Sequence, residues 1–475
     1  MMPRRLGIQP VGRKRPIFIK MIIGTLIVGV IYGTVCFYRQ VPAPKSEIVF
    51  SLTGLLGTIA LFRRKCFFSS TIAIIFTLIF IFATIIITEV SRIQFNVEQS
   101  ELVFFEPLKS QALHALLVFN CLFLTLLLWG APKSWTWPVP TNVEKSFGKV
   151  SSWLLLILSL VLALLNIRGP LITQAAYHSD AYVGFIKEHS SDAGVQAMSS
   201  VFLIGSVCAA LRGYGPKHVN FYFILISVVG MVVFFNLLRG QRSEFLGFLF
   251  FFAVLYYSLS KAKYKIAVIF LLAPLAFVFI LSWASVRATA VEQRIGPAVL
   301  EGASNAWQDI KEGSVMKMDK LPKATWDMLE TTYLYERGIR RNGKTYLNLI
   351  SQRIPSFIAE VIGYERPVSE PWVLAEYFQH GGGIFMVAEG YWNFGLAGVI
   401  GLAVVLAYIC IAIEKFYRRL PPILYYGYYG SVMISASNLF TGVQSFVRGI
   451  EIPFFMSVAG WLLMKVASYR KNTFR

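Results

Sequence analysis

Long apolar runs recur along almost the whole chain and restrict the environment in which it can fold. Of the 475 residues, 56% are hydrophobic and 15% are charged. A helix of roughly 20 apolar residues crosses the hydrocarbon core of a bilayer and satisfies its own backbone hydrogen bonds there. The sequence therefore predicts an all-α polytopic membrane protein with about twelve transmembrane helices. The predicted spans are 21–38, 48–62, 67–87, 112–129, 150–167, 194–211, 219–237, 245–258, 266–285, 396–413, 423–440 and 452–466.

The formal net charge of +20 is distributed unevenly between the segments that join these spans. If the N-terminus lies inside and the spans alternate, the inner segments hold 24 lysines and arginines and 2 acidic residues, against 21 and 23 in the outer segments. Basic residues collect on the inner side of membrane proteins, where they contact anionic lipid. The charge thus predicts an orientation with both termini inside and the lipid bilayer as a partner, and it does not indicate nucleic acid.

Residues 286–395 form the one long interval that is too polar for hydrocarbon. Positions 286–394 hold 12 lysines and arginines and 13 acidic residues, together with recurrent apolar residues. The spacing of Trp326, Leu329 and Tyr333 favours a helix within 321–350. We therefore predict a folded, largely helical outer domain at 286–395. Residues 1–285 would form nine spans before it, and residues 396–475 would form three spans and a tail after it.

Arg239 and Arg242 lie in a short polar turn between two predicted spans. Charged side chains at such a depth are costly unless they are paired or face water. Guanidinium groups bind phosphate oxygens in a bidentate fashion, so the two arginines are candidate ligands of a diphosphate. The alternative is simple snorkelling of the side chains to the interface, with Glu244 as an ionic partner.

Two further arginines are predicted at the same outer face. Arg448 precedes the last span and is a candidate diphosphate ligand, although it could simply pair with Glu451. Arg287 follows the ninth span, where a single cation is also ordinary interface anchoring.

His380 and Glu389 are the candidate general bases of the polar interval. His380 is followed by three glycines, Gly381–Gly383, which allow a ligand to approach the backbone closely. The ordinary pKa of histidine suits proton transfer near neutral pH. Glu389 competes for this role, but it could instead be the structural partner of an arginine, and His380 could merely donate a hydrogen bond. We find no metal-ligand signature among the outer residues, so we expect no metal and no cofactor.

The order of several short motifs resembles the Wzy-type O-antigen and oligosaccharide repeat-unit polymerases, a family related to enterobacterial common antigen polymerase and to O-antigen ligase. These motifs cover roughly half of the chain, and each alone is short. They are Gly240-Gln241-Arg242, Ile354-Pro355-Ser356-Phe357, Arg366-Pro367, His380-Gly381-Gly382 with the segment from Glu389 to Gly398, and Ser445-Phe446-Val447-Arg448.

The resemblance implies a GT-C-like fold with its large loop in the periplasm and an active site on the periplasmic face of the bacterial inner membrane. It implies a metal-independent, inverting glycosyltransferase that moves a growing glycan from undecaprenyl diphosphate to the next lipid-linked repeat unit. Expected partners are this lipid-linked oligosaccharide, a chain-length regulator of the Wzz type and a flippase. The diphosphate ligands would be Arg239, Arg242, Arg448 and Arg287, the catalytic base His380 or Glu389, and the glycan-binding residues Tyr391, Trp392 and Arg353.

Two other functions share the same sequence features. An O-antigen ligase, which transfers glycan to lipid A core, has the same topology and outward arginines. A flippase for lipid-linked oligosaccharides would also be apolar with a basic inner face, although such carriers usually show two similar halves.

Overall fold

The computed structural model describes residues 17–41, 47–87, 92–94, 101–103, 106–132, 141–165, 192–239, 242–259, 323–351, 361–364, 373–374, 376–378, 384–439 and 442–473. Almost all of these residues are helical. The helices are α1 (Ile17–Arg39), α2 (Glu47–Arg63), α3 (Phe67–Ile87), α4 (Glu106–Gly130), α5 (Asn142–Leu165), α8 (Asp192–Gly213), α9 (Val219–Arg239), α10 (Arg242–Leu259), α13 (Lys323–Glu336), α14 (Lys344–Ser351), α17 (Met386–Tyr417), α18 (Tyr426–Asn438) and α19 (Val443–Thr473). A 3₁₀ turn, η4 (Pro422–Tyr425), precedes α18, and strands β1 (Arg92–Gln94) and β2 (Glu101–Val103) form one antiparallel pair.

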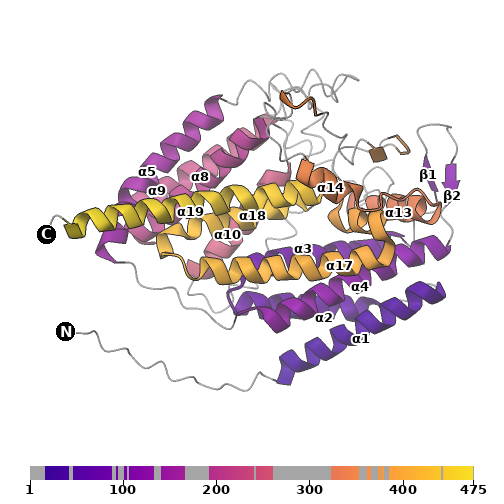
Figure 1. Cartoon of the computed structure of the whole chain (residues 1–475). Helices are drawn as coiled ribbons and strands as arrows, with labels where there is room; N and C mark the ends of the chain where they lie inside the picture. The colour runs from indigo at the N-terminus through magenta and orange to yellow at the C-terminus, as the bar shows by residue number, and fades with distance from the viewer. Residues whose placement is uncertain are drawn as a thin grey trace, which may run out of the picture.

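The long helices run side by side, with neighbours in the chain pointing in opposite directions (Figure 1). Helices α1 to α4 pack together, α5 lies along α8, and α9 contacts both. Helix α18 is central, because it contacts α3, α8, α10 and α19. Its residues Gly427, Gly430 and Ser431 are buried, so small side chains let the surrounding helices approach closely.

The structure confirms a multi-pass helical membrane protein. Within the described part of the chain, six helical segments are long and apolar enough to cross a bilayer: Ile17–Arg39, Phe67–Thr84, Leu108–Gly130, Glu144–Leu165, Met386–Tyr417 and Ser445–Val466. Four shorter apolar helical segments accompany them: Val49–Arg63, Met198–Gly213, Val219–Phe234 and Gly247–Tyr257. The predicted span 423–440 coincides with α18, whereas the predicted ninth span, 266–285, lies outside the described residues. The total of twelve therefore stays a prediction.

The outer helices present apolar side chains to their surroundings. Leu165 on α5, Ile226 on α9 and Leu463 on α19 are each at least 70% exposed. Water would disfavour so large an apolar surface, whereas lipid chains do not. These faces are the sides of the bundle that contact the bilayer.

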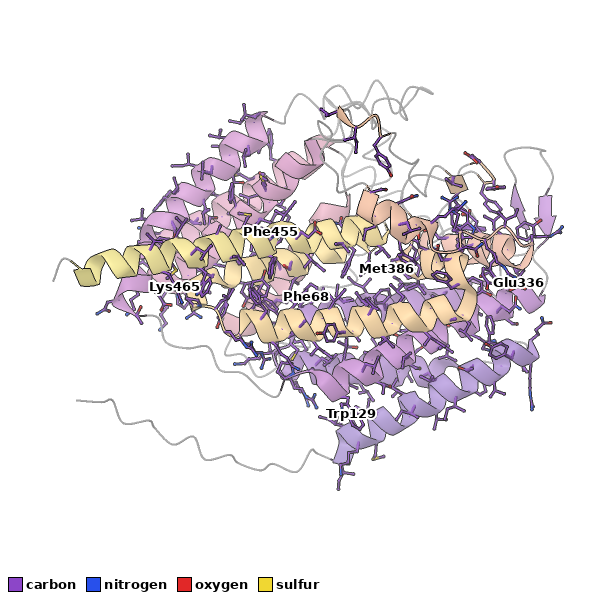
Figure 2. The ribbon with its side chains drawn as sticks, viewed as in Figure 1. Phe68, Trp129, Glu336, Met386, Phe455 and Lys465 are labelled. Carbon is purple, nitrogen blue, oxygen red and sulfur yellow. The ribbon has the colours of Figure 1, made fainter. Side chains whose placement is uncertain are left out.

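The two ends of the bundle differ in composition. One end, called the basic end, carries cations at the turn after α2, at the start of α5, after α8 and after α17; they are Arg63, Arg64, Lys65, Lys145, Lys149, Arg212, Lys217, Arg418 and Arg419. The opposite end, called the α13 end, holds α13, α14, the strand pair and the beginning of α17 (Figure 1). Figure 2 labels Glu336 at the α13 end and Lys465 on α19 toward the other end.

Three buried carboxylates accept hydrogen bonds from backbone N–H groups at the beginnings of other helices. Asp327 accepts one from Phe385 at the start of α17, and Glu389 accepts one from Val443 at the start of α19. Glu414 accepts one from Ser69 in the first turn of α3, at 3.1 Å. The first N–H groups of a helix have no partner within it, and they attract negative charge. Each carboxylate thus ties two helices together where water does not reach.

Candidate functional site

The element that shapes the α13 end is a sharp reversal inside α17. Phe394 and Gly395 have non-helical backbone angles, and Gly395 has φ 60° and ψ −143°, a conformation that favours glycine. A Cβ atom added at Gly398 would overlap the carbonyl oxygen of Gly390. In a straight helix residues eight apart are separated by about 12 Å along the axis, so the chain folds back at this point.

Helix α17 is therefore a hairpin of two limbs. The short limb runs over residues 386–393, and the long limb runs from 396 to the basic end (Figure 1). The sequence predicted a span beginning at 396 and placed residues 386–395 in the outer domain. The long limb begins at 396, as predicted for the span, and the short limb is helical and packs against its start.

Glu389 on the short limb links the hairpin to α19. Its side chain is 5% exposed, and its Oε2 atom accepts a hydrogen bond from the backbone N–H of Val443 at 2.9 Å. A Cβ atom at Gly442 would lie 3.2 Å from the same oxygen, so a glycine there leaves room for the carboxylate. Burial, followed by the charge of Glu389, raises the pKa of Tyr346 on α14. The carboxylate thus lies where α14, α17 and α19 meet.

Asn393, at the end of the short limb, joins the hairpin to the turn between α13 and α14. Its Oδ1 atom accepts a hydrogen bond from the N–H of Gly343 at 2.7 Å. Its Nδ2 group donates to Oγ1 of Thr345 at 2.7 Å and to the carbonyl oxygen of Glu389 at 2.8 Å. Asn393 is 1% exposed, and the two bonds that its Nδ2 group donates are buried, whereas the bond from Gly343 is partly buried.

Tyr391 and Trp392, predicted as glycan-binding residues, are both fully buried in the structure. The hydroxyl of Tyr391 donates to Glu336 at 3.3 Å, and Nε1 of Trp392 donates to the carbonyl oxygen of Ile339 at 2.9 Å. The guanidinium of Arg341 lies 5.6 Å from the centre of the Trp392 ring. In this conformation the two rings support the turn at the α13 end and do not line a surface for a sugar.

Three of the predicted diphosphate ligands occupy the ends of helices. Arg239 is the last residue of α9, Arg242 is the first residue of α10, and Arg448 stands in the second turn of α19. Helix α9 starts after the basic end and α10 returns toward it, so Arg239 and Arg242 lie at the helix ends away from the basic end. Helix α19 begins where Glu389 meets Val443. Arg287, Arg353 and His380 lie outside the described residues.

Asp327 is a contributor to this end that the sequence analysis did not identify. It is fully buried on α13, and its Oδ2 atom accepts the hydrogen bond from Phe385 N–H that begins the short limb. From sequence alone, a carboxylate within a predicted amphipathic helix is expected to face the solvent. Its partner lies 58 residues away in the chain, so no local pattern reveals the contact.

Within the described residues, no group of three or more His, Cys, Asp and Glu side chains is placed to hold a metal ion. Comparison of the chain with known protein families, with curated proteins and with solved structures finds no match.

Alanine at Asn393 should loosen the turn between α13 and α14 without unfolding the bundle. The substitution leaves the N–H of Gly343 without its buried acceptor, which costs about 1–3 kcal/mol. We expect faster trypsin cleavage after Arg340 and a modest drop in Tm. Asn220→Ala at the basic end is the control. Equal cleavage rates for the two variants would contradict the role given to Asn393.

Proposed function

We propose that this protein is a membrane-embedded polymerase that joins lipid-linked oligosaccharide repeat units into a surface polysaccharide. The basic end would face the cytoplasm, following the rule that cations collect on that side, and the α13 end would face the periplasm. The observation that supports the proposal best is the junction at the α13 end. There Glu389 is hydrogen-bonded to the start of α19, the helix that carries Arg448. Arg239 ends α9 and Arg242 begins α10, and in this proposal both arginines act at the same end of the bundle.

In the proposed reaction, a sugar hydroxyl of the incoming lipid-linked unit attacks the anomeric carbon of the growing glycan. A new glycosidic C–O bond forms, the bond between that carbon and the diphosphate oxygen breaks, and undecaprenyl diphosphate leaves with the electron pair. The hydroxyl proton passes to a general base. Arg239, Arg242 and Arg448 would neutralise the negative charge that grows on the leaving diphosphate.

The contacts of Glu389 favour a division of roles between the two candidate bases. One oxygen of Glu389 already accepts a hydrogen bond from the backbone of α19, and the side chain is almost completely buried. We therefore propose that Glu389 is a positioning residue, which holds α19 against the hairpin. His380 is then the proposed base, and its ordinary pKa suits the task.

Purified protein and an undecaprenyl-diphosphate-linked repeat unit, without metal or nucleotide, are sufficient to test this function. A ladder of longer lipid-linked glycans is the expected result. Products that appear only when lipid A core is added would indicate a ligase instead. Transfer of the intact lipid-linked unit between leaflets, with no change in its length, would indicate a flippase.

Arg242→Ala and His380→Ala should each abolish long glycan chains while membrane insertion and Tm stay unchanged. Loss of the base alone lowers the rate by about 10²- to 10⁴-fold. Gel analysis of the glycans from cells that carry each variant provides the measurement. Lys415→Ala, at the basic end, is the control and should give the parental pattern. Normal ladders from both site variants would remove this assignment of residues.

A further inference from the structure

The turn between α13 and α14 carries a concentration of positive charge that the proposed reaction does not use. Residues 336–347, called the basic turn, contain four cations and one carboxylate; the cations are Arg337, Arg340, Arg341 and Lys344, and the carboxylate is Glu336. Arg337, Arg340 and Lys344 are exposed, whereas Arg341 is half-buried against Trp392. The turn is thus a positively charged surface of the protein.

Aromatic rings fix the positions of these arginines. The guanidinium of Arg340 lies 4.3 Å from the centre of the Tyr335 ring, and its Nε donates to the carbonyl oxygen of the same residue at 3.3 Å. The guanidinium of Arg337 lies 5.2 Å from the centre of the Tyr333 ring. Because both guanidinium groups lie over rings and remain exposed, their positive charge stays accessible at the protein surface.

A chain of ring contacts connects the basic turn to helix α1. Phe37, near the end of the membrane-spanning helix α1, lies 6.2 Å from the ring of Tyr391. Tyr391 in turn lies 5.3 Å from Tyr335, the ring that holds Arg340. Helix α1 ends with Tyr38, which is 74% exposed, and Arg39, a pair typical of the membrane–water interface. The basic turn therefore lies beside the end of the membrane-spanning helix α1.

Exposed apolar side chains alternate with the cations of the turn. Leu347 on α14 is 65% exposed, and it lies one helical turn from Lys344 on the same face. Ile339, between the arginines, is 37% exposed. An exposed leucine does not strengthen the binding of a small soluble anion. A segment that lies at the membrane–water interface, in contrast, typically combines cations with apolar residues.

We infer that the basic turn is an interfacial anchor that binds the headgroups of anionic phospholipids, with Leu347 inserted among the acyl chains. Each exposed cation near an anionic surface contributes roughly a fivefold preference for that surface. Asn393 and Trp392 hold this turn to the hairpin, so the anchor fixes the height of the short limb relative to the membrane. The inference does not depend on the proposed polymerase activity.

A nitroxide label at Leu347→Cys in the full chain tests the anchor. The five native cysteines are buried, so an exposed cysteine can be labelled selectively. Two accessibilities of the label are measured: one to oxygen, which is concentrated in lipid, and one to a water-soluble nickel chelate. The accessibility ratio is the first divided by the second, so it is high for a label in lipid. Bilayers of phosphatidylcholine are compared with bilayers that also contain phosphatidylglycerol. We expect a higher ratio in the anionic bilayer.

Two sets of substitutions distinguish attraction by positive charge alone from binding that needs the geometry of the guanidinium groups. Arg337→Gln with Arg340→Gln and Lys344→Gln should lower the preference of the turn for the anionic bilayer by about fivefold for each cation removed. The accessibility ratio in the anionic bilayer should therefore fall to its value in phosphatidylcholine, with Tm unchanged. Arg337→Lys with Arg340→Lys keeps the charge and should behave as the parent.

Three results would overturn the inference. The first is a parental ratio that is equal in the two bilayers. The second is a lysine variant that behaves like the glutamine variant, because this would point to a shaped phosphate site. The third is a change in the accessibility ratio when inorganic pyrophosphate is added to the phosphatidylcholine bilayer. Such a change would mean that the turn binds a soluble phosphate anion and not a lipid headgroup.

Discussion

Gly398→Ala is expected to prevent the α17 hairpin from closing and to reduce sharply the yield of folded protein. The added Cβ would overlap the carbonyl oxygen of Gly390 and would lie 3.1 Å from the Cβ of Phe394. The clash with Gly390 involves a backbone atom, so no change of side-chain rotamer relieves it. Overpacking costs typically 1–3 kcal/mol, and here the only relief is to separate the two limbs, so we expect a loss at the upper end of that range. Such a loss is a large share of the 5–15 kcal/mol by which a typical protein is stable.

Gly401→Ala is the matched control for this prediction. Gly401 lies on the same limb, less than one helical turn further along, and nothing surrounds the position of its Cβ within 4 Å. Alanine there should leave Tm unchanged or raise it, because alanine favours a helix over glycine by up to about 1 kcal/mol. Detergent extraction, size-exclusion chromatography and thermal unfolding measure both variants. Equal yields and equal Tm values would mean that the two limbs do not pack as the structure shows.

Glu389→Gln is expected to retain polymerisation within about tenfold of the parent, whereas Glu389→Ala loses both polymerisation and thermal stability. The amide oxygen of glutamine still accepts the hydrogen bond from Val443 N–H, so the start of α19 stays in place. Alanine leaves this N–H without its buried acceptor, at a cost of about 1–3 kcal/mol, and opens a void beside Gly442. Polymerisation is measured as the rate of glycan elongation in the reconstituted reaction, and stability as Tm.

His380→Gln completes the comparison and should lower the rate by about 10²-fold or more. The opposite pattern, with Glu389→Gln inactive at an unchanged Tm and His380→Gln active, would make Glu389 the base. That pattern would refute the positioning role and would leave the proposed polymerase function intact. Inactivity of the parent protein toward the lipid-linked unit would refute the function itself.

The apolar runs alone located most of the helices, because the requirement for a helix to bury its backbone in hydrocarbon is local. Where the structure describes the chain, each predicted span coincides with a helix. The ends of the helices were less accurate: α19 begins at Val443 and not at 452, because its first two turns carry polar residues that hydropathy assigns to a loop. The helix expected within 321–350 is present as α13 and α14, separated by the basic turn.

The contacts that build the α13 end could not be predicted from the sequence. Glu389 is 54 residues from Val443, and Asp327 is 58 residues from Phe385, so each pair meets only because the helices between them fold back. The reversal at Gly395 was also hidden, since helical segments lie on both sides of it. The glycines at 390, 395 and 398 permit the reversal, but their presence alone does not predict it.

The sequence by itself determined that this protein belongs in a membrane, roughly where its helices run, and which end of the bundle is basic. These properties depend on the apolar and charged content of short segments, which the surrounding fold does not change. Only the tertiary structure decided that Glu389 holds the start of α19, that Tyr391 and Trp392 are buried, and that Arg337 and Arg340 lie over tyrosine rings. Burial and hydrogen bonding depend on which distant segments meet, and that is a property of the packed bundle as a whole.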